Sequence, residues 1–110
     1  MPQTLIFDPR ALRESAQRAC DLLKALGNAD RLLLLCQLTQ GERCVSELEQ
    51  LTGIRQPSLS QQLAVLREES LVATRRDGKH IYYSVRSPAA LAVMQVLYDH
   101  FCDKGAAQSC

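Results

Sequence analysis

The sequence predicts a mainly α fold with a β-hairpin wing, a winged helix-turn-helix whose elements follow in the order α-α-α-α-β-β-α. Three observations lead to this fold. Two short amphipathic segments meet at Gly53 within residues 45–67, the apolar period changes from helical to alternating at Leu71, and a last apolar segment regains the helical period. With 110 residues and no internal repeat or linker, residues 1–110 are expected to form one domain.

The first two helices are expected over residues 9–26 and 29–40. Pro9 suits a first helical turn, and Gly27 with Asn28 ends the first helix. Asn28 is then a candidate N-cap of the second helix, and Gly41 follows its end. The centre of the second helix, residues 32–36, is apolar on every side, which predicts burial on most faces.

Residues 45–67 have the pattern of a helix-turn-helix. Ser46 with Glu49 fits a capping box at the start of a third helix, which ends at Gly53. A fourth helix is expected to start at Pro57. The apolar side chains of this segment are expected to point inward: Leu48, Leu51, Ile54, Leu59, Leu63 and Leu66.

Residues 71–86 predict the wing, because two β-rich runs flank Asp77, Gly78 and Lys79, a strong hairpin signal. A last helix over residues 88–103 carries apolar side chains on more than one face. One small domain needs only one apolar stripe on such a helix. The surplus therefore predicts a homodimer that pairs through the helices at 9–26 and 88–103.

The charge distribution favours a DNA-binding protein over other classes. Net charge is only +1, yet residues 55–86 carry six Lys/Arg against three acids. No apolar run spans a bilayer and the first residues lack a secretory signal, so we expect a cytoplasmic protein without membrane contact. No nucleotide motif or catalytic arrangement is visible, so an enzyme is not expected. A protein-interaction module without DNA affinity remains an alternative.

The fourth helix and the wing supply the candidate DNA contacts. Short hydroxyl and amide side chains can donate to and accept from base edges in the major groove, and cationic side chains at a hairpin tip suit phosphates or a minor groove. These residues are Gln56, Ser58, Ser60, Gln61 and Gln62 in the helix, and Arg75, Arg76, Lys79 and His80 in the wing. A homodimer would present two such units to a pseudo-palindromic double-stranded operator. The alternative for the wing is an ordinary solvated turn.

The five cysteines, Cys20, Cys36, Cys44, Cys102 and Cys110, do not form a recognisable framework. Their number is odd, no CxxC occurs, and the spacing is unlike that of a zinc finger or a disulfide-rich domain. Packing residues, metal ligands and redox sensors all remain open from the residues alone. Cys20 falls near the apolar face of the first helix, which indicates packing.

Residues 22–101 resemble the ArsR-type winged-helix repressors. The resemblance lies in LLKALGNADRLLLL, in GERCVSELEQLTGIRQPSLSQQLAVLREESLV and in the wing TRRDGKHIYYSV. It implies a homodimeric repressor that leaves its operator when an inducer binds or reacts. Metal sensors of the family carry a Cys-x-Cys at the third helix. Here Cys44 matches the first position, but Ser46 stands at the second and Glu49 at a further ligand position, so no metal site and no cofactor are expected.

The resemblance is closer to the thiol-switch branch, the biofilm growth-associated and sulfide-responsive repressors. That branch carries one cysteine late in the second helix and one near the end of the last, where this chain has Cys36 and Cys102. The resemblance implies that a disulfide or polysulfide bridge joins them in response to reactive sulfur species, persulfides or oxidants, and that DNA is released. A virulence activator in the same branch shows that repression does not follow automatically. The alternative is an arsenite or soft-metal-responsive repressor using Cys44, Cys102 or Cys110.

Overall fold

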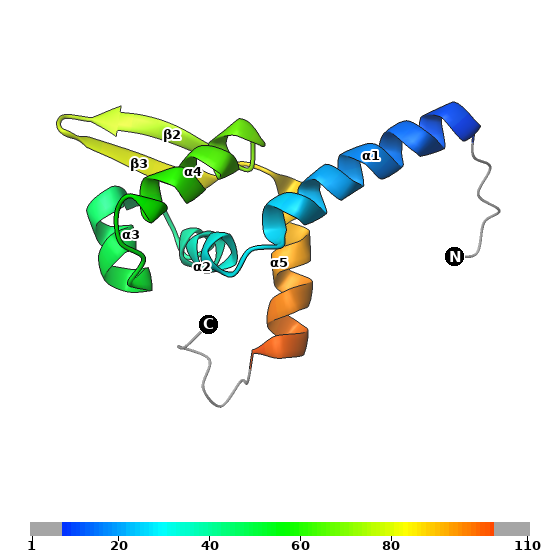
Figure 1. Ribbon diagram of the computed structural model, residues 1–110. Helices are drawn as coiled ribbons and strands as arrows, with labels where there is room; N and C mark the ends of the chain where they lie inside the picture. The colour runs from blue at the N-terminus through cyan, green and yellow to red at the C-terminus, as the bar shows by residue number, and fades with distance from the viewer. Residues whose placement is uncertain (1–7, 103–110) are drawn as a thin grey trace.

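The computed structural model describes residues 8–102 and has the predicted winged-helix order with one added strand (Figure 1). Helices α2, α3 and α4 and the hairpin form the body, and α1 and α5 project from it. The elements are α1 (Pro9–Leu26), α2 (Ala29–Leu38), β1 (Arg43–Cys44), α3 (Val45–Thr52), α4 (Ser58–Glu68), β2 (Val72–Asp77), β3 (His80–Val85) and α5 (Pro88–Phe101). Asp103, the expected last residue of the final helix, lies outside the described residues.

Three of the helices are capped at their N-termini by a polar side chain. Each of these side chains accepts a hydrogen bond from a backbone N–H that has no partner within the helix. The Asn28 side chain accepts from the backbone N of Arg31 at 3.1 Å, which confirms the predicted cap of α2. Asp8 accepts from Arg10 N at 3.3 Å at the start of α1. At the start of α5, the Ser87 side chain accepts from the backbone N of Ala90 at 3.0 Å.

The third helix begins at Val45 as predicted, but two details of the helix-turn-helix differ from the prediction. Glu47, not Glu49, accepts from the backbone N of Cys44 at 2.9 Å, and Ser46 lies inside α3. This bond is the main cause that lowers the pKa of the Glu47 carboxyl. In the second case, α4 begins at Ser58 and Pro57 precedes it as the N-cap residue. Gly53 ends α3 as predicted, with a φ of 76° that a side chain would disfavour.

The core is a layer of leucines shared by α2, α3 and α4. Its largest fully buried side chains are Leu34, Leu35, Leu48, Leu59, Leu63 and Leu66. The predicted burial of Leu59, Leu63 and Leu66 in the fourth helix is therefore confirmed. One expectation of burial was wrong, because Leu51 at the end of α3 is 51% exposed. The centre of α2 is buried on most faces as predicted, and Leu33 lies on its one exposed side.

The sheet has three antiparallel strands in the order β1-β3-β2. Val72 pairs with Val85 at its base and Asp77 with His80 at its tip, where Gly78 takes a φ of 62° in the turn. The strand β1, which the sequence did not predict, pairs Arg43 with Tyr83 and Cys44 with Tyr82. This pairing joins the start of α3 to the middle of β3.

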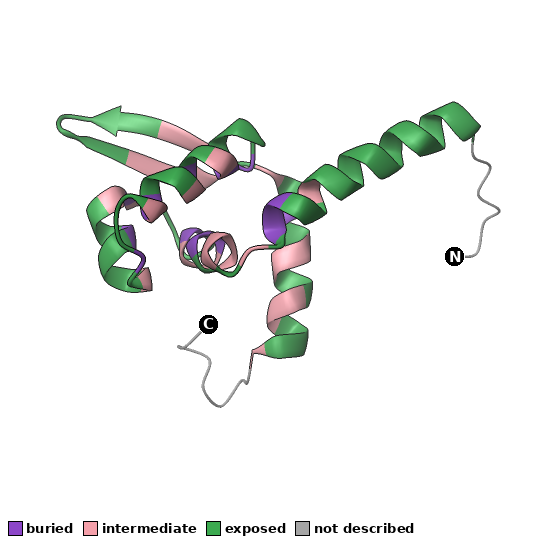
Figure 2. Ribbon diagram, in the orientation of Figure 1, coloured by how far each residue is buried: buried purple, intermediate pink, exposed green. Residues whose placement is uncertain are grey.

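The helices α1 and α5 carry exposed apolar residues, and Figure 2 colours most of α1 and part of α5 as exposed. Nearly all of α1 is exposed, and Leu12 and Leu23, eleven residues apart, lie on one of its faces. In α5, Leu91 is 43% and Val96 is 55% exposed. Of the helices within residues 8–102, even the longest lacks the apolar length that a bilayer crossing requires.

Candidate nucleic-acid interface and thiol positions

The outer face of α4 presents polar side chains from a firmly held helix. Its inner face is fixed by Leu59, Leu63 and Leu66, which are at most 2% exposed. Ser60 and Gln61 lie on the exposed side, and Ser58 is half-buried at the first turn. Hydroxyl and amide groups placed on a rigid helix are suited to contact base edges.

Gln56 serves the fold at the start of α4. Its Oε1 accepts from the backbone N of Ser60 at 3.0 Å, which satisfies one of the N–H groups of the first helical turn. The Gln56 side chain is thereby aligned with the beginning of the helix, beside Pro57. The predicted DNA contact at Gln56 stays a prediction.

Gln62 is half-buried and is engaged inside the protein. Its Oε1 accepts from Nη1 of Arg31 at 2.8 Å. The two residues are 31 positions apart in the sequence and join α4 to the start of α2. No local sequence pattern predicts this contact, because it depends on how the helices pack.

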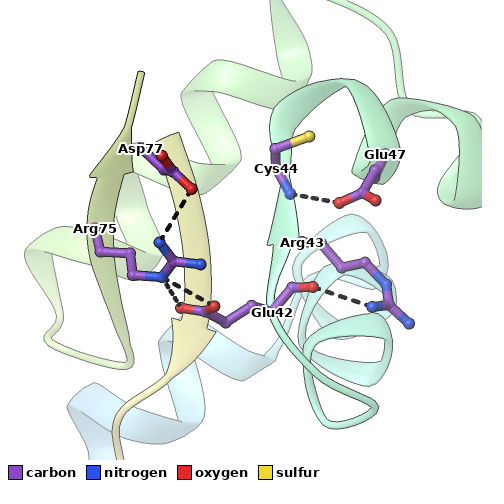
Figure 3. Close-up of polar contacts among 6 residues, drawn as sticks. All are labelled: Glu42, Arg43, Cys44, Glu47, Arg75 and Asp77. Carbon is purple, nitrogen blue, oxygen red and sulfur yellow. Dashed lines mark hydrogen bonds and ion pairs between the residues drawn. The ribbon is translucent and has the colours of Figure 1, made fainter. Parts of the chain in front are cut away.

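Arg75 in the wing is held between two carboxylates (Figure 3). Its Nε lies 2.9 Å from Oε2 of Glu42, and its Nη1 lies 3.8 Å from Oδ2 of Asp77. Its guanidinium also lies 4.8 Å from the ring centroid of Tyr82. The hydrogen bond and charge of Glu42 raise the pKa of Arg75, so the guanidinium stays charged at every physiological pH.

The remaining predicted wing residues lie at the exposed tip. Arg76 donates through Nε to the carbonyl of Gly78 at 3.5 Å, and Lys79 and His80 are exposed. The structure therefore gathers the cationic side chains at the hairpin end, but it ties Arg75 to Glu42.

An open groove of about 440 Å³ lies between α4 and β3. Its lining includes Ser60, Arg67 and the half-buried Tyr83. Arg67 and Tyr83 were not predicted as contacts, although the basic residue at the end of the fourth helix was visible in the sequence. Their position beside Ser60 makes them further candidates for contact with a nucleic-acid backbone.

The two candidate redox residues lie on different helices. Cys36 is half-buried in the last turn of α2, and burial raises the pKa of its thiol. Cys102 is the half-buried C-cap residue of α5, and its backbone N donates to the carbonyl of Tyr98 at 3.0 Å. Figure 1 shows the C-terminal end of α5 lying apart from α2. The predicted link between these two cysteines stays a prediction.

The other cysteines occupy three different settings. Cys44 is buried at 6% exposure, with its Sγ 3.3 Å from Oγ of Ser46. Cys20 is exposed on α1, so packing against this chain's core is not its role. Cys110 lies outside the described residues. Within residues 8–102, the side chains of His, Cys, Asp and Glu nowhere gather in groups of three or more that could hold a metal ion.

Comparison with known proteins places these features in a family. The sequence profile described as "Bacterial regulatory protein, arsR family" matches residues 28–74. The biofilm growth-associated repressor of Xylella fastidiosa is 46% identical over 91 residues, which cover 83% of this chain and 80% of the relative. The crystal structure of the transcriptional repressor BigR from Xylella fastidiosa is 43% identical, covers 89% of this chain and 100% of that chain, and gives a TM-score of 0.79.

A more distant structure adds information on assembly. The homodimeric winged helix-turn-helix DNA-binding domain Mb0332 from Mycobacterium bovis is described as a possible ArsR-family regulator. It is 29% identical, covers 92% of this chain and 94% of that chain, and gives a TM-score of 0.70. The similarity extends over helices on both sides of the helix-turn-helix.

Proposed function

We propose, from the premise that the chain belongs to the ArsR family of bacterial regulatory proteins, that it is a homodimeric transcriptional repressor that binds double-stranded operator DNA. One observation carries this function. A helix that is held by fully buried leucines presents Ser60 and Gln61 outward, and the adjacent hairpin ends in exposed cationic side chains. The helix would read base edges, and the wing would contact the phosphate backbone.

A salt series on a selected duplex tests this function. Duplexes enriched by the protein from a randomised library serve as probes, and binding is measured by fluorescence anisotropy. We expect the logarithm of the association constant to fall linearly with the logarithm of the salt concentration, because bound Lys and Arg displace counterions from phosphates. Failure to enrich any duplex would instead favour a protein-interaction module.

The ion pair between Glu42 and Arg75 predicts a gain of DNA affinity on substitution. In Glu42→Gln the guanidinium loses its closest carboxylate and becomes available to a phosphate. We expect binding to strengthen about threefold at low salt, and the salt slope to steepen by about one unit. Glu14→Gln in α1 makes the same change of net charge far from the wing and is the control. Unchanged affinity in Glu42→Gln would show that Arg75 does not contact DNA.

A thiol switch would control the DNA binding. Its support is the position of Cys36 in the last turn of α2 and of Cys102 at the end of α5, one of the projecting helices. With both residues reduced, the thiolate of Cys36 attacks the outer sulfur of a persulfide RSSH, which yields a cysteine persulfide and RSH. The Cys102 thiolate then attacks the inner sulfur and expels hydrosulfide, which takes up a proton to become H₂S. A disulfide remains. If a second RSSH first converts Cys102 to a persulfide as well, the terminal sulfur of the Cys36 persulfide attacks the inner sulfur of the Cys102 persulfide, expels hydrosulfide and leaves a trisulfide bridge instead.

Such a bridge would change how the dimer holds its two copies of α4, the helices proposed to read DNA (the recognition helices). A direct disulfide needs Cα atoms within about 7 Å, so it would fix the end of α5 beside the end of α2, and a sulfur chain would relax this demand. If α1 and α5 form the dimer contact, moving α5 reorients the two halves. A 100-fold loss of operator affinity requires about 2.7 kcal/mol of coupling.

The inducer is identified by comparing compounds on the same protein. We expect a persulfide to release the duplex and arsenite or cadmium to leave it bound. Mass spectrometry of the released protein should recover a peptide in which Cys36 and Cys102 are linked. Release by arsenite with no such linkage would favour the soft-metal alternative, which uses Cys44, Cys102 or Cys110.

A further inference from the structure

Arg31 connects three elements of the fold through one guanidinium group. It lies in the first turn of α2 and is half-buried. Its Nε donates to the carbonyl of Ala25, and its Nη2 donates to the carbonyl of Lys24 at 3.1 Å. The third nitrogen, Nη1, donates to Oε1 of Gln62 in α4 at 2.8 Å. Each nitrogen of the guanidinium therefore has an acceptor, and the acceptors belong to α1 and α4.

The contact with α1 has a clear physical basis. Lys24 and Ala25 lie in the last turn of α1. Backbone carbonyls there have no N–H donor within the helix and carry the partial negative charge of its C-terminal end. A planar guanidinium satisfies two of these carbonyls at once and still has a nitrogen for a third acceptor. A lysine at this position could not span the same three acceptors, because its donors diverge from one atom.

The contact with Gln62 gives that residue a different role from the one its sequence position suggests. From its position on the fourth helix, Gln62 was predicted to contact DNA. In the structure its amide oxygen faces Arg31, and its side chain is half-buried. The exposed Gln61 beside it keeps the outward position.

We propose that Arg31 and Gln62 are positioning residues that fix the orientation of α4 relative to α1. This inference rests on the proposed function, in which α1 belongs to the dimer contact and α4 reads DNA. Leucine packing between helices is non-directional and tolerates small shifts, whereas hydrogen bonds from a planar group restrict direction. In the dimer, the angle between α1 and α4 occurs twice and sets the separation of the two recognition helices. Arg31 and Gln62 therefore contribute to the selection of half-site spacing.

Two substitutions at Gln62 separate positioning from base recognition. The probe is a two-half-site duplex selected by the wild-type protein, together with versions in which the centre is one base pair shorter or longer. Gln62→Glu keeps an acceptor for Arg31 and becomes a charged partner, whereas Gln62→Ala removes the acceptor. We expect Gln62→Ala to bind the selected duplex about tenfold more weakly and to lose most of its preference for the original spacing. Gln62→Glu should stay within about threefold of the wild type and keep that preference.

The opposite pattern would overturn the proposal. If Gln62 reads a base, Gln62→Glu should bind more weakly than Gln62→Ala because its charge faces the DNA. Both variants would then change the base preference at one position of each half-site and leave the preferred spacing unaltered. Retention of wild-type affinity and spacing by Gln62→Ala would also overturn it.

Arg31→Met and Arg31→Lys test the other side of the contact. Both keep a long side chain, and neither can bridge the three acceptors, so both should flatten the spacing preference as Gln62→Ala does. Adding Gln62→Ala to Arg31→Met should cause little further change, since both remove the same contact. If Arg31→Met fails to fold, as judged by thermal melting, the two Gln62 variants still decide the question. Absence of binding by the wild-type protein to any duplex would refute the proposed function, whereas wild-type binding with unaltered spacing in the variants refutes only this inference.

Discussion

Leu23→Asp is expected to convert the dimer to monomers and to weaken operator binding by about 100-fold or more. Leu23 is 59% exposed on α1 and shares a helical face with Leu12, which is 46% exposed. Pairing of two such helices would bury both leucines, and a carboxylate in that contact would be desolvated without a partner. Two linked recognition helices bind two half-sites with a high effective concentration, and this advantage disappears in the monomer.

The matched control for Leu23→Asp is Arg10→Gln. It lowers the net charge by the same one unit, and it lies on the opposite side of α1 from Leu23. We expect it to remain dimeric and to bind DNA nearly as well as the wild type. Sedimentation velocity gives the assembly state, and binding to duplexes with one or two half-sites gives the gain from pairing. If Leu23→Asp stays dimeric, the dimer contact does not form through the face of α1 that carries Leu12 and Leu23.

The fold could be predicted from the sequence where local patterns govern the structure. The apolar period locates the helices, the Asn28 side chain begins α2, and Gly78 marks the hairpin turn. Leu51 shows where this reasoning fails. It has the spacing of a core residue, but α3 is short and contacts the body mainly through Leu48, so Leu51 is exposed.

The candidate site could be predicted only in part for a related reason. Ser60, Gln61 and the cationic wing tip are exposed, as their sequence context suggested. The partners of Gln62 and Arg75 could not be predicted, since Arg31 and Glu42 are 31 and 33 residues away in the sequence. Long-range hydrogen bonds depend on packing, and no local pattern encodes them. The short strand β1 was missed because it consists of two residues.

Cys36→Ser is expected to abolish the response to persulfide while leaving DNA binding in place. Serine is nearly isosteric with cysteine, and the site is half-buried, so the fold should tolerate the change. The serine hydroxyl cannot form a persulfide, so the first step of the proposed reaction cannot take place. The measurement is the fraction of duplex that remains bound during titration with a persulfide. The wild type should release its duplex, and the variant should stay bound over the whole titration.

The pH dependence of the reaction provides an independent check on Cys36. Burial raises the pKa of its thiol, so only a small fraction is thiolate at neutral pH. The rate of release by persulfide should therefore increase with pH and continue to rise beyond the ordinary pKa of a cysteine. Cys20→Ser, at an exposed position on α1, is the matched control and should respond as the wild type does. Cys102→Ser alone would not distinguish the thiol switch from the soft-metal alternative, because both use that residue. A normal persulfide response in Cys36→Ser would refute the proposed thiol switch, since no other cysteine in α2 could replace the lost sulfur.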